Sequence, residues 1–182
     1  QESKPRIDRE SRYTSAEGWA RCCRTRLVRC FLASKSLNTM NLVAKAYDLE
    51  FEVPAADTGV GRCLRDSGEF ARAELDFISE NCSGGFLDVG ANVGAICLPF
   101  AARNADKQVV AVEAHPGFGE LLRRNIERNA IQNVRIVHAI AGEARGWVEA
   151  PVAPLDQQGN LGASSLYTKG RPIQRLLMLP LD

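Results

Sequence analysis

The segment 86–94 (FLDVGANVG) constrains the fold of this chain more than any other part of its sequence. Its first four residues form a short apolar run that predicts a buried strand, and two glycines then mark a tight turn. An apolar stretch follows, which predicts a helix from about residue 93 to residue 104. A buried strand, a glycine-containing turn and a helix together are typical of the first half of a βαβ unit.

The same alternation continues downstream. Residues 108–113 (QVVAVE) predict a second strand, 117–129 predict a helix with one apolar stripe, and 133–140 (NVRIVHAI) predict a third strand. Strands and helices in this order predict an α/β fold, a Rossmann-like parallel sheet with right-handed crossovers. Pro99 lies inside the first predicted helix, where we expect it to cause a kink.

The composition is that of an ordinary globular domain. The chain has 182 residues, a net charge of +1 and 45% hydrophobic residues, which excludes disordered, collagen-like and disulfide-scaffold classes. It contains no apolar run long enough to predict a membrane-spanning helix. Six cysteines without a C-x-x-C pair, together with two histidines, argue against a zinc site. They favour free thiols and a reducing, cytoplasmic location.

The positive charge is concentrated near the N-terminus, where residues 1–35 contain nine basic and four acidic side chains. Apolar residues recur at helical spacing within 15–35, which predicts an amphipathic helix with a basic face. That face is either solvated or a contact for an acidic partner. We therefore expect a basic helical extension over residues 1–50. The remainder, 51–182, is expected to form the α/β domain, with a further helix over 69–81 before its first predicted strand.

Five residues carry the chemistry of the predicted turn: Asp88, Gly90, Asn92, Gly94 and, at the end of the second strand, Glu113. Ligands of open parallel sheets bind at the carboxyl ends of the strands, where these residues lie. Gly90 permits close approach of a ligand, and Gly94 allows the following helix to pack tightly on the strand. Asn92 stands where a dinucleotide site needs a glycine, which disfavours a pyrophosphate.

The same five residues favour a ligand that has a ribose and an amino-acid tail but no phosphate. Glu113 can accept hydrogen bonds from a ribose diol, and Asp88 can receive an ammonium group. Free N–H groups at the start of the helix can bind a carboxylate. S-adenosylmethionine has all three of these groups, and it is the cofactor that the pattern indicates.

Residues 86–94 and 110–116 (VAVEAHP) resemble the FkbM-type S-adenosylmethionine-dependent methyltransferases. The resemblance covers about residues 50–182, with further matches in 121–129, 133–143, 160–166 and 179–182. It implies O-methylation of a hydroxyl on a sugar or natural product. Its acceptor would be a small molecule or glycan, and no nucleic acid partner is expected.

The resemblance also implies roles for single residues. Glu113 would bind the ribose, and Ile140 and Ala141 would lie beside the adenine. Ala114 stands where the family usually has a proline, which changes the loop but not the acid. His115 and His138 are interpreted as structural, and no general base is identified.

A further acidic strand of the family has no counterpart up to residue 182. We therefore expect an incomplete sheet, little activity of this chain alone, and self-association through an open sheet edge. Two other interpretations stay open. One is a nucleotide-dependent oxidoreductase, which Asn92 argues against, and the other is a non-catalytic binding module with a vestigial cofactor site.

Overall fold

The computed structural model describes residues 7–8, 41–163 and 169–181. Its centre is a parallel sheet of three strands in the order β4 (Phe86–Val89), β5 (Val109–Val112) and β6 (Val134–Val137). Helix α5 (Cys97–Arg103) connects β4 to β5, and α6 (Pro116–Arg128) connects β5 to β6. The predicted α/β fold is therefore confirmed. The basic helix predicted over 15–35 lies outside the described residues.

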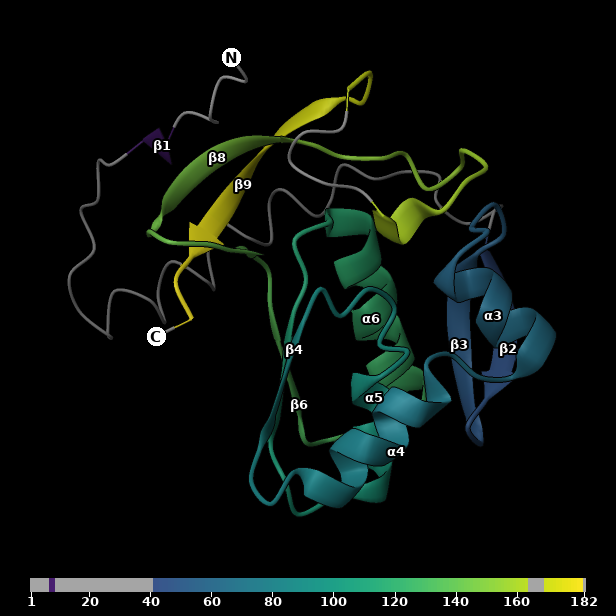
Figure 1. Ribbon diagram of the computed structural model, residues 1–182. Coiled ribbons are helices and arrows are strands. Elements are labelled where there is room, and N and C mark those ends of the chain that lie inside the picture. The colour runs from purple at the N-terminus through teal and green to yellow at the C-terminus, as the bar shows by residue number, and fades with distance from the viewer. Residues whose placement is uncertain (1–6, 9–40, 164–168, 182) are drawn as a thin grey trace.

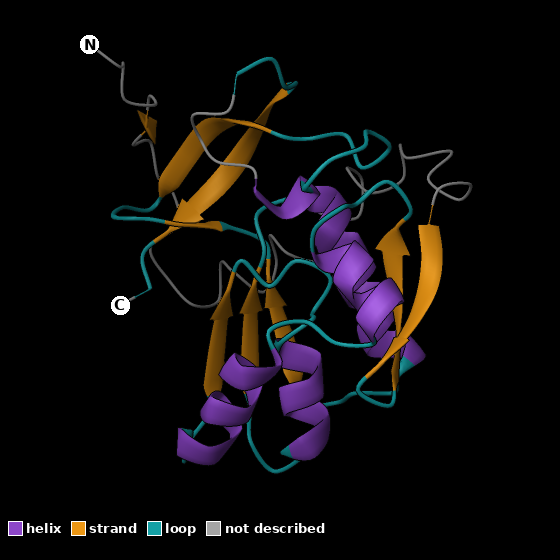
Figure 2. Cartoon of the chain, turned by 45° about the vertical axis from the view of Figure 1, so that its right-hand side comes forward, coloured by secondary structure: helices purple, strands orange, loops and turns teal. Residues whose placement is uncertain are grey.

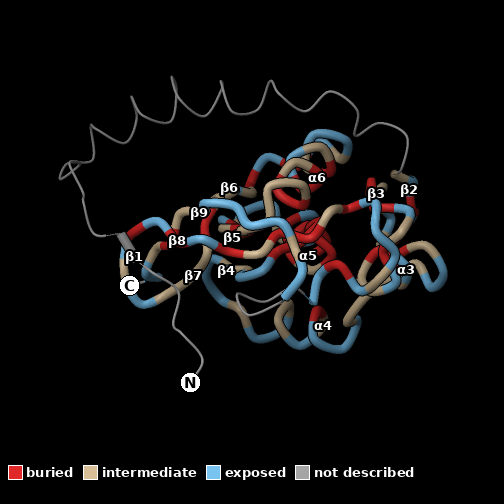
Figure 3. The backbone as a smooth tube through the Cα atoms, turned by 90° about the horizontal axis from the view of Figure 1, so that it is seen from above, coloured by how far each residue is buried: buried red, intermediate tan, exposed pale blue. Residues whose placement is uncertain are grey.

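The helices cover one face of this sheet. Figure 1 shows α4 (Arg72–Asn81), α5 and α6 on the same side of β4 and β6. Between them lies the core, in which Phe100, Leu98 and Leu122 are fully buried, and Figure 3 shows buried residues gathered around α5 and α6. Burying one such side chain stabilises the fold by about 1.5–3 kcal/mol. The opposite face carries Leu87 and Val89, which remain 45% and 49% exposed.

Helix α5 begins later than the sequence predicts. Residues 92–96 form turns, and the helix starts at Cys97. Pro99 therefore lies in the first turn of the helix, where a backbone N–H has no partner within the helix. The expected kink in the helix interior is wrong for this reason.

An antiparallel hairpin precedes the sheet and was missed by the sequence patterns. Strands β2 (Asn41–Ala46) and β3 (Leu49–Pro54) pair along their whole length. Position 50, the expected end of the N-terminal extension, lies inside β3. Tyr47 and Asp48 form a two-residue turn in which both φ angles are positive, 53° and 63°. The Tyr47 hydroxyl donates to the carbonyl of Phe70 and accepts from its N–H, at 2.5 and 2.7 Å. These contacts hold a non-glycine turn in place.

A second sheet stands at the carboxyl ends of the parallel strands, toward which the arrows point in Figure 2. It has the order β1-β8-β9-β7 and consists of β1 (Ile7–Asp8), β8 (Gly146–Pro151), β9 (Ile173–Leu179) and β7 (Ile140–Ala141). The third predicted strand, 133–140, is therefore split, because β6 ends at Val137 and the chain changes sheet at β7. Strands β8 and β9 pair antiparallel over six residues each.

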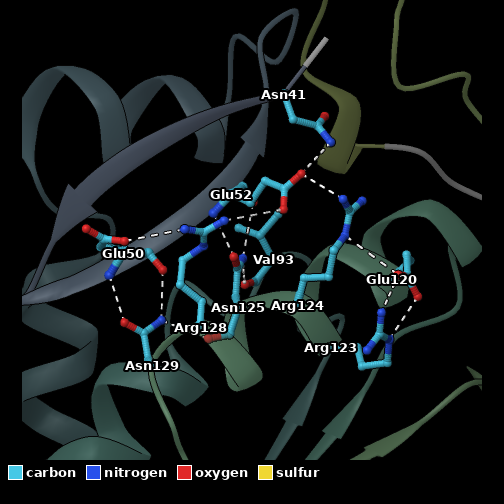
Figure 4. A network of polar contacts seen from close by, with 10 residues as sticks. All are labelled: Asn41, Glu50, Glu52, Val93, Glu120, Arg123, Arg124, Asn125, Arg128 and Asn129. Carbon is cyan, nitrogen blue, oxygen red and sulfur yellow. Dashed lines mark hydrogen bonds and ion pairs between the residues drawn. The ribbon is translucent and has the colours of Figure 1, made fainter. Parts of the chain in front are cut away.

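Asn125 of α6 and Asn129, which caps the C-terminus of this helix, bind the backbone of the hairpin (Figure 4). The amide of Asn125, which is fully buried, accepts from Glu52 N–H at 2.6 Å and donates to the Glu52 carbonyl at 3.1 Å. One turn later, the amide of Asn129 makes the same pair of bonds to Glu50, both at 2.8 Å. Asn125 also donates to the carbonyl of Val93, at 3.0 Å. The hairpin, α6 and the turn after β4 are thus joined by one buried amide.

Candidate functional site

A pocket of about 300 Å³ lies at the carboxyl end of β4. Three of the residues that the sequence singles out line it, namely Asp88, Gly90 and Asn92. The remaining wall comes from the end of the turn, from Phe70, from the start of helix α3 (Val60–Ser67) and from residues 160–163. The pocket therefore lies at the carboxyl end of a parallel strand, where ligands of open α/β sheets bind.

The turn after β4 has a backbone that favours glycine at two positions. Gly90 and Gly94 have φ angles of +84° and +92°, and Asn92 between them has +54°. A Cβ atom on Gly94 would lie 2.5 Å from Cγ of Leu98 and 2.8 Å from Cδ1 of Leu122. Gly94 is therefore needed for packing the turn on α5 and α6, and it does not line the pocket.

Most N–H groups of the turn are already used within the protein. Those of Gly90 and Ala91 both donate to the carbonyl of Val112, at 2.8 and 3.0 Å. The N–H groups of 92–94 donate to a carboxylate, an amide oxygen and a carbonyl of neighbouring residues. At the end of the turn, the N–H groups of Ala95 and Ile96 have no partner within the described part of the chain, and both residues line the pocket. A ligand carboxylate can use these two groups as donors.

Glu113 braces the turn from the end of β5. It is 6% exposed and does not line the pocket. One carboxylate oxygen accepts from the N–H of Asn92 and the other from the N–H of His115, each at 2.7 Å. Burial raises the pKa of Glu113, and these two hydrogen bonds oppose the shift. Because each oxygen has two lone pairs, both retain the capacity to accept one more hydrogen bond.

Asp88 is the acidic group that faces the pocket. It lies in β4 and is partly buried. Burial raises the pKa of its carboxyl, and a hydrogen bond with the thiol of Cys97 opposes this change. Cys97 is fully buried at the start of α5, and burial raises the pKa of its thiol. The thiol therefore stays protonated and can donate to the carboxylate.

Both histidines near the site have structural contacts, as their interpretation from the sequence requires. His115 caps α6, because its Nδ1 accepts from the N–H groups of Gly117 and Phe118 at 3.1 and 3.3 Å. Its Nε2 lies 2.6 Å from the carbonyl of Ala153, so the proton is carried on Nε2. Nδ1 of His138 lies 2.9 Å from the carbonyl of Glu113. Burial lowers the pKa of both imidazoles, which keeps them neutral.

The structure does not bring Ile140 and Ala141 to this pocket. They form β7, whose partners in the second sheet are Met178 and Leu179. Neither residue is among those that line the pocket. Their predicted place beside an adenine stays a prediction that rests on the resemblance alone.

Two segments of the pocket were missed by sequence reasoning. The first is 57–61, where an aspartate precedes two glycines at the start of α3; such a pattern is typical of an aspartate that accepts from nearby backbone N–H groups. The second is 159–163, which lies about 100 residues further along the chain. No local pattern could have indicated that these segments lie together.

The part of the chain that the structure describes adds three findings. Cys63, Cys82 and Cys97 are free cysteines in this part. None of its helices has the length and apolar composition needed to cross a membrane. Within the same residues, no group of three or more histidines, cysteines or acidic residues is placed to hold a metal ion.

Comparison with known proteins identifies methyltransferases among the similar chains. A tRNA (guanine-N(7)-)-methyltransferase of Nitrosomonas eutropha is 33% identical over 81 residues, which cover 39% of this chain and 36% of the relative. A release factor glutamine methyltransferase of Escherichia coli is 31% identical over 77 residues, which cover 40% of this chain and 28% of the relative. The matched region thus spans about a third of the length of these curated relatives. No protein-family model matches the chain.

Solved structures give a weaker likeness. The crystal structure of M. jannaschii TYW2 in complex with AdoMet has a TM-score of 0.44 and 20% identity, over 58% of this chain and 46% of that one. A TM-score below 0.5 is too low to support an inference about function.

The relatives correct one expectation from the sequence. The absence of a nucleic acid partner was expected because the resemblance implied a small-molecule or glycan hydroxyl acceptor. That expectation is wrong, since a relative that matches the chain is named for methylation of a guanine in tRNA. The resemblance rests on cofactor-side residues, which carry no information about the acceptor.

Proposed function

We propose that this chain provides the S-adenosylmethionine site of a methyltransferase. The observation that carries the proposal is the turn between β4 and α5. Asp88, Ala95 and Ile96 line one pocket, the N–H groups of the last two have no partner within the described residues, and Glu113 accepts from the N–H of Asn92 in the same turn. The methyltransferases among the relatives support the same activity. The residues of 86–94 and 110–116 further support placing the chain among the FkbM-type enzymes.

The residues present fit the groups of this cofactor. The carboxylate of Asp88 is suited to the ammonium of the methionine part, and the N–H groups of Ala95 and Ile96 are suited to its carboxylate. The remaining lone pairs of Glu113 are suited to the ribose hydroxyls. When bound, the cofactor would supply an activated methyl group. The residues of this chain would hold it in a fixed orientation, on which much of the rate of such a transfer depends.

Calorimetry with S-adenosylmethionine and S-adenosylhomocysteine tests this proposal directly. We expect both to bind the wild-type chain, and Asp88→Asn to weaken each by about tenfold or more, as for the loss of a hydrogen bond between charged groups. Asp106→Asn is the matched control, because Asp106 is exposed. Binding of 5′-methylthioadenosine, which lacks the amino-acid part, should be equal in the wild type and both variants.

The other interpretations give different results in the same experiment. A heat of binding with NAD, and none with S-adenosylhomocysteine, would favour the oxidoreductase interpretation. A folded chain that binds neither ligand would refute the proposal and favour the binding module. If the cofactor binds, transfer of labelled methyl groups to total RNA and to total protein would show which of the acceptors named for the relatives this chain can use.

A further inference from the structure

Two segments that are distant in the sequence meet at the rim of the pocket. The N–H of Thr58 donates to the carbonyl of Gly159 at 2.9 Å, and the N–H of Gly159 donates to the carbonyl of Ala56 at 3.2 Å. Residues 159–163, here called the strap, are thereby held against the start of α3. Three residues of the strap line the pocket, which makes it one of the pocket walls: Asn160, Gly162 and Ala163.

The carboxylate of Asp57 fastens this junction. It is 1% exposed, and one oxygen accepts from the N–H groups of Gly59 and Leu161 at 3.0 and 3.2 Å. The other oxygen accepts from the N–H of Gly61 at 2.6 Å. A buried carboxylate is costly unless it is hydrogen-bonded, and the N-terminus of a helix favours negative charge. The three N–H groups therefore satisfy the buried carboxylate of Asp57, and these contacts hold the strap to the start of α3.

The strap in turn contacts the turn that would hold the cofactor. A Cβ atom on Gly162 would lie 3.0 Å from Nδ2 of Asn92, so the strap passes close to this side chain. The N–H of Asn92 donates a hydrogen bond to the carboxylate of Glu113. A continuous set of contacts thus leads from Asp57 through the strap to the turn and to Glu113.

We propose that Asp57 is a positioning residue of the cofactor site: it holds the strap across the pocket and thereby slows the release of bound cofactor. This inference rests on the proposed function, since it concerns the same pocket. Asp57 does not itself line the pocket and acts through the position of residues 159–163.

The test compares Asp57→Asn and Asp57→Ala with the wild-type chain, and uses Asp66→Asn as the matched control. Asp66 lies on α3, the helix that Asp57 precedes, and its exposed side chain pairs with Arg62. The rate at which S-adenosylhomocysteine dissociates is measured by stopped flow. We expect it to rise about tenfold in Asp57→Asn and further in Asp57→Ala, because asparagine keeps one oxygen that can accept N–H groups. Asp66→Asn should release the ligand at the wild-type rate.

Two further measurements separate this role from a merely structural one. Hydrogen exchange should become faster in 159–163 of the Asp57 variants, while exchange in α6 stays unchanged. Gly162→Ala keeps Asp57 but introduces a methyl group against Asn92, and it should also speed dissociation. If the Asp57 variants do not fold, Gly162→Ala still tests whether the strap retains the cofactor, and release at the wild-type rate from folded Gly162→Ala overturns the inference.

Each remaining outcome overturns the inference in a recognisable way. If the variants fold and release S-adenosylhomocysteine at the wild-type rate, the strap does not retain the cofactor, and the proposed function is unaffected. If the folded wild-type chain binds no S-adenosylhomocysteine, the proposed function fails and the role of Asp57 fails with it.

Discussion

Replacing Glu113 by glutamine tests how the turn after β4 is held. Glutamine has the same size as glutamate, so the change opens no cavity. The carboxylate accepts from two backbone N–H groups at 2.7 Å, those of Asn92 and His115. An amide can satisfy only one of them, because its NH2 group is a donor. In Glu113→Gln one buried N–H therefore faces another donor.

The expected loss of stability follows from this count. An unsatisfied buried donor costs about 1–3 kcal/mol. Glutamine recovers part of this cost because it avoids burying the charge of a side chain that is 6% exposed. We expect the free energy of unfolding to fall by about 1–2 kcal/mol. Affinity for S-adenosylhomocysteine should fall by about 10–100-fold, since a hydrogen bond from the ribose to a charged group is worth roughly 1.5–3 kcal/mol.

Urea denaturation and calorimetry measure these two quantities. Glu80→Gln is the matched control, because Glu80 is exposed on α4 and should change neither of them. A Glu113→Gln protein with wild-type stability would show that the two hydrogen bonds do not brace the turn. Wild-type affinity in a folded Glu113→Gln protein would show that Glu113 does not bind the ribose.

The pH dependence of stability gives an independent check on the burial of Glu113. Its pKa is raised in the folded protein above the ordinary value of 4.5, so the folded state keeps the proton to higher pH than the unfolded state. The free energy of unfolding should therefore fall as pH rises from the ordinary value through the raised one. The glutamine variant should lack this decrease, and parallel pH profiles of the two proteins would contradict the reasoning.

Three further substitutions, and Gly84→Ala as the matched control for one of them, have outcomes that the geometry determines. His115→Asn keeps a cap on α6 but removes a group whose pKa burial lowers; the wild type should lose stability as pH falls below about 6.5, and the difference between the two proteins should shrink in that range. Gly94→Ala forces a Cβ into contact with two leucines at φ +92° and should cost about 3 kcal/mol in urea denaturation. Gly84→Ala, where a Cβ meets nothing within 4 Å, should be near neutral. Asn125→Ala leaves three buried backbone groups without their partner and should cost about 3–5 kcal/mol by the same assay, and a cost below 1 kcal/mol would mean that water replaces the amide.

The central sheet and the turn that lines the pocket can be predicted from the sequence. Local patterns suffice there, because a buried parallel strand must be an apolar run and its turn must accept positive φ angles. The strands at 86–89 and 109–112 lie where the sequence predicts them, and Asp88, Gly90 and Asn92 meet at one pocket. The packing role of Gly94 also follows from its place between a strand and a helix.

Contacts between residues that are distant in the sequence follow only from the folded structure. The β2–β3 hairpin turns at Tyr47 and Asp48, which carry no glycine signal, because the Tyr47 hydroxyl binds the backbone of Phe70. Glu113 accepts from the backbone N–H groups of Asn92 and His115, which no spacing of residues can indicate. Asp57 reaches Leu161 across more than 100 residues. A local pattern reports the preference of a backbone segment for helix, strand or turn, whereas the partner of a buried polar group is fixed only when the whole chain has folded around it.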